Sequence, residues 1–268
     1  MSRTIFIQPI FVPDEKRFQR NLDSINSFIN YCEKNNVKID CIFGGWGKEE
    51  YMTKIIDILS RKDLPFNVVS NNKFSKNYGK ATVVNYLHKK AEEKQLKYDF
   101  ILTCDSDIVF KEDEPNMIER LEKASERLDE LRNKKTGLIA LQQEGHCCHW
   151  EHKFQNKLDF EEQVKFPNRA EGIAGGCLFI RKEAWDKIGG YRVLGVYAGD
   201  DAYMMIDMVR NGYTIQLCTT ISIIHPHDTD EEYQKWKNKV CQRDSAGGKV
   251  KSNLDTIIKE AEDFWGKR

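Results

Sequence analysis

The sequence lacks any long apolar run, and its first residues lack the apolar core of a secretory signal. We therefore expect a soluble, cytoplasmic protein without stable insertion into a membrane. The sequence also lacks net charge, because 42 basic side chains balance 42 acidic ones. This balance argues against undirected binding to nucleic acid, although it is compatible with a local basic face.

Repeats, low-complexity tracts and linkers are absent as well, so we expect one domain over residues 1–268. It divides into an N-terminal half (1–110), a second half (111–228) and a C-terminal segment (229–268). Most of the eight cysteines lie in apolar stretches and are expected to be reduced core residues. The stretch GHCCHWEH at 145–152 has the ligand types of a zinc site, but its two cysteines are adjacent, and we expect no zinc there.

Apolar periodicity predicts that strands and helices alternate along the first half. Strands are expected at 4–12, 37–45, 65–70 and 99–104, with helices at 18–32, 51–59 and 79–93 between them. Later elements are helices at 114–133, 200–211 and 254–264, strands at 137–143 and 172–180, and one or two strands within 213–224. This order predicts an α/β protein with a mostly parallel sheet and helices on both faces.

The stretch FILTCDSDIVF at 100–110 is a buried strand that runs directly into Asp105 and Asp107. Two carboxylates this close together at the end of a buried strand are electrostatically unfavourable unless a cation lies beside them. Hard divalent cations take oxygen ligands and bridge carboxylates to phosphates. The pattern therefore predicts a Mn²⁺ or Mg²⁺ site that also binds a diphosphate, with a solvated acidic turn as the alternative.

Two later stretches, GGCLFIRKEAWDKIGGY at 175–191 and GDDAYMMIDMVRNGY at 199–213, follow this acidic turn in order. Together the three motifs resemble the metal-dependent glycosyltransferases of the GT-A fold, a Rossmann-like α/β fold. The likeness is to the large family 2 group, with some similarity to galactosyl- and N-acetylgalactosaminyltransferases. It covers roughly residues 3–228, and it implies a nucleotide-sugar-binding first half and an acceptor-binding, catalytic second half.

The resemblance implies transfer of a hexosyl or pentosyl group from a nucleotide-diphosphate sugar, with UDP expected, to an acceptor hydroxyl with inversion. Asp105 and Asp107 match the motif for metal and nucleotide sugar, Asp107 is the expected direct ligand, and His225 completes the metal site. Near the nucleotide, the matching residues are Pro9, Asn77, Gly79, Lys80, Asn85, Gly175 and Gly176. For His225 the alternative is a packed or hydrogen-bonded histidine, and for the glycine pair it is a bulge in a strand.

Asp200 and Asp201 fall where the family has Glu-Asp before a helix. The resemblance implies that Asp201 is the general base and that Asp200 holds sugar or acceptor hydroxyls, although the two roles can be reversed. The alternative is that Asp200 only caps the helix. Trp46 stands where many relatives carry an acid that binds the base, so it is a candidate for stacking on a base or sugar.

The basic stretch at 235–251 is interpreted as a flap over the donor or as a solvated helix and loop. A third hypothesis is contact with a polyanionic acceptor, such as a modified base in phage DNA, which would place the protein in the host cytoplasm. A sugar nucleotidyltransferase is a further alternative, but QPIFVPDEKR lacks the glycine-rich loop expected after the first strand. The last alternative is a non-catalytic protein that binds a sugar nucleotide or glycan.

Overall fold

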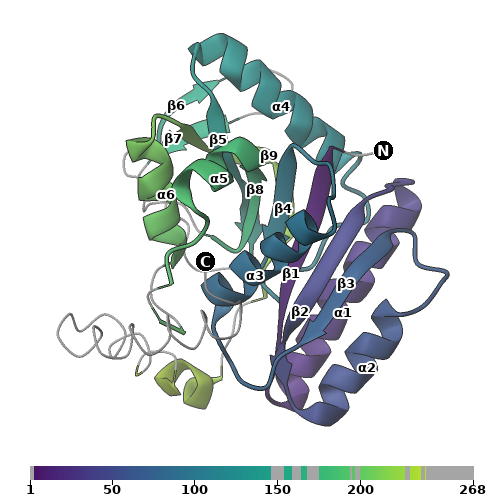
Figure 1. Cartoon of the computed structure of the whole chain (residues 1–268). Coiled ribbons are helices and arrows are strands. Elements are labelled where there is room, and N and C mark those ends of the chain that lie inside the picture. Colours follow the sequence, from purple (N-terminus) through teal and green to yellow (C-terminus); the bar gives the residue numbers. More distant parts are fainter. Residues whose placement is uncertain are drawn as a thin grey trace.

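The computed structural model describes residues 3–145, 154–158, 164–167, 175–193, 195–196, 200–226, 230–236 and 239. Its first half alternates strands and helices in the predicted order (Figure 1). These elements are β1 (Thr4–Val12), α1 (Glu15–Lys34), β2 (Asp40–Gly47), α2 (Glu49–Leu59), β3 (Asn67–Lys73), α3 (Lys80–Glu93) and β4 (Phe100–Cys104).

The second half contains more strands than the sequence analysis predicts. Its elements are α4 (Met117–Arg132), β5 (Thr136–Glu144), β6 (Phe154–Leu158), β7 (Val164–Pro167), β8 (Cys177–Arg181), α5 (Lys182–Ile188), α6 (Asp200–Arg210) and β9 (Thr214–Ile224). The helix expected at 254–264 lies outside the described residues, as does the stretch 146–153, which holds most of GHCCHWEH.

Across the described residues, nine strands form one sheet in the order β3-β2-β1-β4-β8-β5-β9-β7-β6. Strands β1 to β4 are parallel, and β5 pairs with β9 in the same direction. Strand β8 lies antiparallel between β4 and β5, and β7 is antiparallel to both β6 and β9. The mostly parallel α/β sheet expected from the sequence is confirmed.

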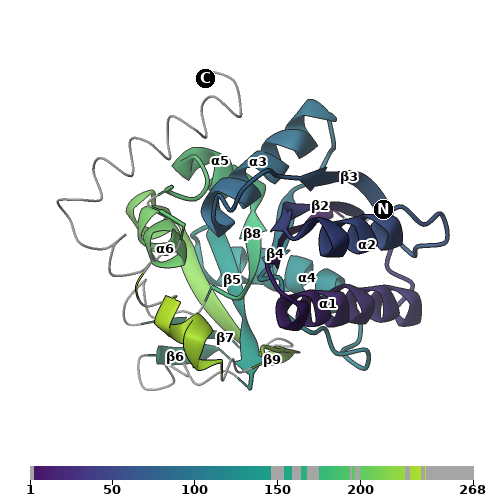
Figure 2. The ribbon, with the colours of Figure 1, turned by 90° about the horizontal axis from the view of Figure 1, so that it is seen from below.

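Helices cover both faces of the sheet, as predicted (Figure 2). One apolar cluster joins the sheet to α1, α2 and α4, and the other joins it to α3, α5 and α6. Helix α1 begins at Glu15, three residues before the apolar pattern of the sequence, because the Asp14 carboxylate accepts a hydrogen bond from the backbone N–H of Arg17 at 2.8 Å. Such an N-cap stabilises a helix by about 1 kcal/mol.

Several boundaries differ from the sequence-based expectation, and two strands were not predicted. The strand expected at 172–180 begins at Cys177, because its partner β4 ends opposite it at Cys104 and the ladder stops there; residues 172–174 lie outside the described residues. The helix expected from 114 begins at Met117, because Asn116 takes a left-handed backbone with φ of 46°. Strands β6 and β7 were not predicted, since they are only five and four residues long and so carry too short a pattern.

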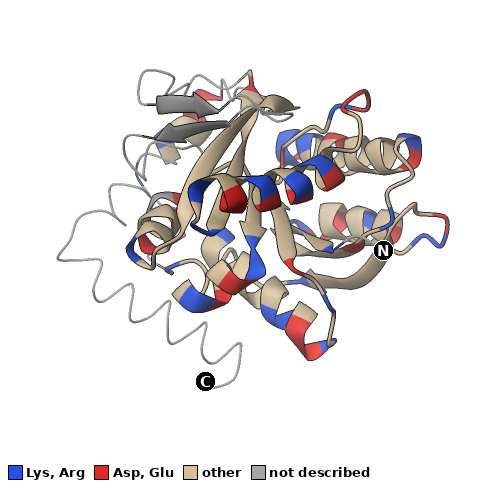
Figure 3. Cartoon of the chain, turned by 90° about the horizontal axis from the view of Figure 1, so that it is seen from above, with Lys and Arg blue, Asp and Glu red and all other residues tan. Residues whose placement is uncertain are grey.

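Charges of both signs alternate over the helix surfaces (Figure 3). On α4, for example, Lys123 pairs with Glu119, and Arg127 pairs with Glu130. Exposed pairs of this kind contribute little to stability, but they keep the surface mixed in sign. Within the described residues, none of the helices is long and apolar enough to cross a membrane.

The part of the C-terminal segment that is described, residues 230–236, packs against the first half of the chain. Asp230 accepts an ion-pair hydrogen bond of 2.8 Å from Arg17, whose guanidinium also lies over the ring of Tyr233. Trp236 stacks on Phe11 near the end of β1, with ring centroids 6.3 Å apart. Most of the basic stretch at 235–251 lies outside the described residues.

Candidate functional site

The acidic turn after β4 is fixed by contacts to three other parts of the chain. The backbone N–H of Asp105 donates to the carbonyl of Gly176 at 2.7 Å. The Gln8 side-chain amide donates to the carbonyl of Asp105, and the Asn21 amide donates to the carbonyl of Ser106. A strand end held in this way is a preorganised turn rather than a loose acidic loop.

Strand pairing brings His225 to this turn. Beyond the turn, Val109 exchanges two backbone hydrogen bonds of 2.9 Å with Ile224, the last residue of β9. On the other side, the backbone N–H of His225 donates to the carbonyl of Glu144 at the end of β5. The His225 ring is thereby placed with its Nε2 atom 3.4 Å from Asp107 Oδ1.

Asp105, Asp107 and His225 form one cluster, which we call the strand-end cluster. Each residue offers one ligand atom, and these atoms lie within 4.8 Å of one another. Two carboxylate oxygens and an imidazole nitrogen are suitable ligands for Mn²⁺ and acceptable ones for Mg²⁺. The predicted metal-binding residues are therefore brought together, and their chemistry fits a divalent cation.

The charges of the strand-end cluster influence one another strongly. Burial favours the neutral form of Asp107, but the hydrogen bond and charge of His225, together with Arg20, hold the pKa of this carboxyl below its ordinary value. Burial likewise disfavours the charged form of His225, yet Asp107 and Asp105 raise the pKa of the imidazole. The Arg20 guanidinium on α1, which the sequence analysis did not single out, lies 3.8 Å from Asp107 Oδ2.

Lys80 connects the strand-end cluster to the start of α6. Its Nζ atom lies 2.7 Å from Asp105 Oδ1, 3.0 Å from Asp201 Oδ1 and 2.9 Å from the carbonyl oxygen of Gly175. Burial opposes the charge of Lys80, but Asp105 and Asp201 raise the pKa of the ammonium well above its usual range. Lys80 is thus a charged bridge between the predicted metal ligand and the predicted base.

Asn77 and Gly79 shape the loop that delivers Lys80. Gly79 has a φ of 82°, which a residue with a side chain rarely adopts, and its N–H donates to the Asn77 side chain at 2.9 Å. A Cβ atom at Gly79 would also lie 2.8 Å from the backbone of Val196. These two predicted residues directly precede Lys80 in the loop before α3, and they fix where this helix begins.

The glycine pair before β8 leaves room for side chains of the chain itself. A Cβ atom at Gly175 would lie 1.9 Å from Cγ of Asp201, and one at Gly176 would lie 2.8 Å from Oε1 of Gln143. Gln143 is buried at the end of β5 and was not among the predicted site residues. Its only signal in the sequence is its place at the end of a predicted parallel strand.

Asp200 and Asp201 occupy the first turn of α6, where the helix dipole favours negative charge. Burial, followed by the charge of Asp201, raises the pKa of Asp200 to about 7, although Lys80 opposes the shift. The carboxyl of Asp200 therefore changes protonation near neutral pH.

The other predicted residues lie at or beside the carboxyl ends of the parallel strands. Pro9 lies in β1, and the β1–β4 register, continued beyond its last pair Ile7–Thr103, places it level with Asp105. The Asn85 side chain makes two hydrogen bonds to the backbone of Tyr191, so it fixes that turn. Trp46 is stacked on Phe11, with ring centroids 5.9 Å apart.

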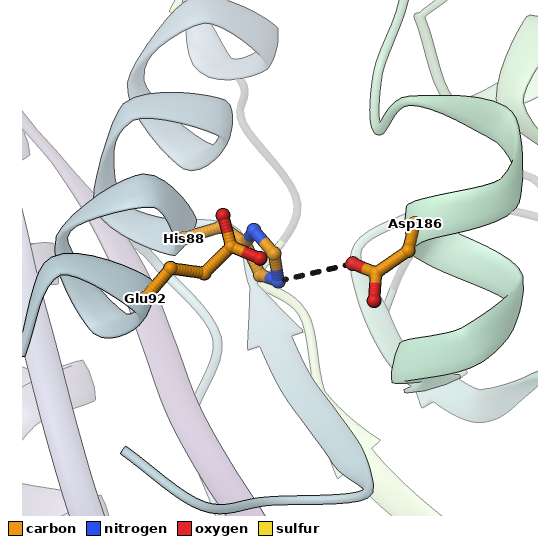
Figure 4. A group of neighbouring side chains, drawn as sticks. All are labelled: His88, Glu92 and Asp186. Carbon is orange, nitrogen blue, oxygen red and sulfur yellow. Dashed lines mark ion pairs between the residues drawn. The ribbon is translucent and has the colours of Figure 1, made fainter. Parts of the chain in front are cut away.

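A second group, which we call the helix cluster, contains His88 and Glu92 of α3 and Asp186 of α5 (Figure 4). His88 is buried, and its Nε2 atom lies 2.9 Å from the hydroxyl of Tyr98 and 3.9 Å from Asp186 Oδ1. The ammonium of Lys182 lies 2.5 Å from Asp186 and 3.4 Å from Glu92. A lysine therefore already provides the cation for these two carboxylates.

The mostly parallel sheet with its flanking helices is that of a GT-A-like α/β fold. The sequence matches no known family and no curated protein. Among solved structures, TarS 1–349 from S. aureus superposes with a TM-score of 0.57 at 12% identity, covering 99% of this chain and 73% of that one. The same protein in complex with UDP gives a TM-score of 0.55 at 12% identity, covering 97% and 70%.

A third solved structure is the mannosyltransferase PcManGT from Pyrobaculum calidifontis in complex with GDP-Man and Mn²⁺. It superposes with a TM-score of 0.54 at 13% identity, covering 87% of this chain and 59% of that one. At these identities, the similarity establishes the fold that the chain shares with these proteins.

Proposed function

We propose that this protein is a metal-dependent glycosyltransferase that moves a sugar from a nucleotide-diphosphate sugar, with UDP as the expected nucleotide, to an acceptor hydroxyl. The observation that carries the proposal is the convergence of Asp105, Asp107 and His225 within 4.8 Å, joined through Lys80 to Asp201. The fold supports it, because one structure of similar fold contains UDP and another contains GDP-Man with Mn²⁺.

In this proposal, the strand-end cluster holds Mn²⁺ or Mg²⁺, with Asp107 and His225 as the expected direct ligands. When bound, such a cation stabilises the negative charge that develops on a departing diphosphate. The ammonium of Lys80, 2.7 Å from Asp105, adds a second positive charge on the side facing α6. Together these groups would favour departure of the nucleotide diphosphate.

The base in this proposal is one of the two acids that begin α6. As the bond from the anomeric carbon to the diphosphate breaks, the acceptor oxygen forms a new bond there, and its proton passes to Asp201 or Asp200. The ammonium of Lys80 lies 3.0 Å from Asp201 and places a positive charge beside this carboxylate. Asp200, with a pKa raised to about 7 by burial and by Asp201, is suited to exchange a proton near neutral pH. Attack from the side opposite the diphosphate would invert the anomeric centre.

The first experiment measures melting temperature with UDP and with GDP, each in the presence of Mn²⁺ and of a chelator. A ligand present at 100 times its Kd stabilises the native state by about 2.7 kcal/mol. We expect a shift with UDP and Mn²⁺ that disappears in Asp107→Asn and persists in Glu92→Gln, its isosteric counterpart in the helix cluster. Shifts in melting temperature that occur equally without Mn²⁺ and in Asp107→Asn would contradict the proposal.

Turnover is tested next, by measuring hydrolysis of UDP-sugars in the absence of an acceptor. UDP-galactose and UDP-N-acetylgalactosamine are the first donors to test, because the motif at 175–191 resembles transferases of that type. Release of UDP that requires both Mn²⁺ and Asp107 would distinguish an enzyme from a protein that only binds the nucleotide sugar.

A further inference from the structure

Gln143 is a buried polar side chain at the strand-end cluster to which the proposed reaction assigns no role. It is 6% exposed, and its Oε1 atom lies 2.9 Å from Nδ1 of His225. The same histidine presents its Nε2 atom to Asp107. One ring nitrogen of His225 therefore faces an amide, and the other faces the cluster.

This contact determines which nitrogen of His225 is available for a cation. The amide oxygen of Gln143 is only an acceptor, so the Nδ1 atom beside it has to carry the proton. A neutral imidazole has a single N–H, and its lone pair then lies on Nε2. When a cation lies between Nε2 and Asp107, Gln143 thus selects the tautomer whose lone pair faces that cation; without a cation, the Asp107 carboxylate is itself an acceptor for an Nε2–H.

The backbone supports the position of Gln143. Gly176 leaves the space that the amide of Gln143 occupies, since a Cβ atom there would lie 2.8 Å from Oε1 and 2.9 Å from Nε2. The carbonyl of Gly176 also accepts the hydrogen bond from the backbone of Asp105. Gly176, the residue before β8, therefore contacts both Gln143 and Asp105.

We propose that Gln143 is a positioning residue that holds His225 as the Nδ1–H tautomer and so presents Nε2 as a metal ligand. This inference rests on the proposed function, because it assumes that the strand-end cluster binds a divalent cation. Groups that orient a histidine ligand in this way commonly change metal affinity by about 10- to 100-fold when they are removed.

The first test is Mn²⁺ binding without nucleotide, followed by titration calorimetry or by the electron paramagnetic resonance signal of free Mn²⁺. We expect Gln143→Leu to weaken binding by about 10- to 100-fold. Gln143→Glu, which keeps an acceptor at the same reach, should retain affinity. Gln216→Leu is the matched control, because Gln216 is a fully buried glutamine whose amide bonds Thr214 far from the strand end.

The second test reads the tautomer directly in protein loaded with Mg²⁺, which is diamagnetic. In Mg²⁺-loaded protein carrying ¹⁵N-labelled histidine, His225 should show a protonated Nδ1 and an unprotonated Nε2. Its resonances are assigned by their loss in His225→Asn. The preference should diminish in Gln143→Leu and persist in Gln216→Leu, whereas a merely structural role for Gln143 would leave the tautomer unchanged.

The outcomes separate this inference from the proposed function. If the wild type binds Mn²⁺ through Asp107 but Gln143→Leu binds it equally well, the role of Gln143 is wrong and the metal site stands. A His225 that is protonated on Nε2 in the Mg²⁺-loaded wild type would also overturn the role of Gln143. If the wild type binds no Mn²⁺, with or without UDP, both the proposed metal dependence and this inference fail. Melting curves of each variant verify that it is folded.

Discussion

The strand-end cluster and the helix cluster contain the same residue types, a histidine with two carboxylates, but they differ in their neighbours. In the helix cluster, Lys182 contacts both carboxylates, and the hydroxyl of Tyr98 bonds the histidine. The cluster thereby links α3 to α5. Its polar groups are satisfied by the protein itself, as expected of a structural contact.

The strand-end cluster is built differently. Its two acids lie in a turn held by backbone hydrogen bonds, and its histidine arrives from the end of β9. Ligands of open α/β sheets bind at the carboxyl ends of strands, which is where these residues lie. Composition alone therefore does not identify a metal site: a lysine lies beside the carboxylates of both clusters, and it is the position at the carboxyl ends of the strands that distinguishes the strand-end cluster.

The largest expected difference between the clusters is in turnover. Asp107→Asn should lower donor hydrolysis by about 1,000-fold, because losing about 4 kcal/mol of charge stabilisation in the transition state has that effect. Glu92→Gln should leave turnover within about twofold, as expected for a surface change away from the reacting groups. Steady-state rates with UDP-sugar and Mn²⁺ test this pair, and similar losses in both variants would remove the distinction.

The sequence could predict the acids of the strand-end cluster because their signal is local. An apolar strand that runs into Asp105 and Asp107 needs no knowledge of distant residues, and His225 is likewise marked by the end of an apolar strand. The structure places both acids beside His225, as the metal-site prediction requires. Their roles in binding and catalysis stay predictions.

Gln143 could not be predicted, because its role depends on long-range register. Strands β5 and β9 pair Leu141 with Cys218, but the next residue, Gln142, pairs with Ser222. This irregularity sets Gln143 level with Ile223, from where its side chain reaches the His225 ring, and no local pattern encodes it. The antiparallel position of β8 between β4 and β5 also depends on long-range pairing. The apolar pattern of a five-residue strand does not show whether the strand runs parallel or antiparallel to its neighbours.

The second prediction compares the two lysines. Lys80→Met should lower the free energy of unfolding by about 2–3 kcal/mol, because it leaves Asp105 and Asp201 without their shared, largely buried cation. Lys182→Met removes a more exposed pair and should cost about 1 kcal/mol or less. Urea denaturation measures both values, and equal losses would show that the two sites are electrostatically alike.

Lys80→Met has a second consequence that Lys182→Met should not share. Because an ammonium 2.7 Å from Asp105 competes with a metal ion, its removal should strengthen binding of Mn²⁺ alone while it weakens binding of the UDP-sugar. Calorimetry with each ligand separates the two effects. Weaker Mn²⁺ binding in a folded variant would indicate that Lys80 organises the site and does not compete for it.

The third prediction concerns the stability of the helix cluster at acidic pH. Burial, reinforced by Lys182, lowers the pKa of His88 from 6.5 to about 4, against the opposing effect of Glu92 and Asp186. The unfolded chain therefore binds a proton that the folded chain does not, so stability should fall as the pH drops from about 6.5 to about 4. His88→Gln should reduce this loss, which urea denaturation across the window measures against the wild type.

The last prediction returns to the strand-end site and concerns the pH dependence of turnover. Asp200 faces Asp201, Lys80 and Asp105, and its pKa is raised to about 7, first by burial and then by Asp201. If the pair must be fully ionised to accept the acceptor proton, kcat/KM should rise about tenfold per pH unit up to about pH 7 and then level off. In Asp200→Asn, the residual rate should lose this inflection, whereas His88→Gln should keep it. A profile that retains the inflection in Asp200→Asn would assign the titration to another group and would leave Asp200 the lesser role of capping α6.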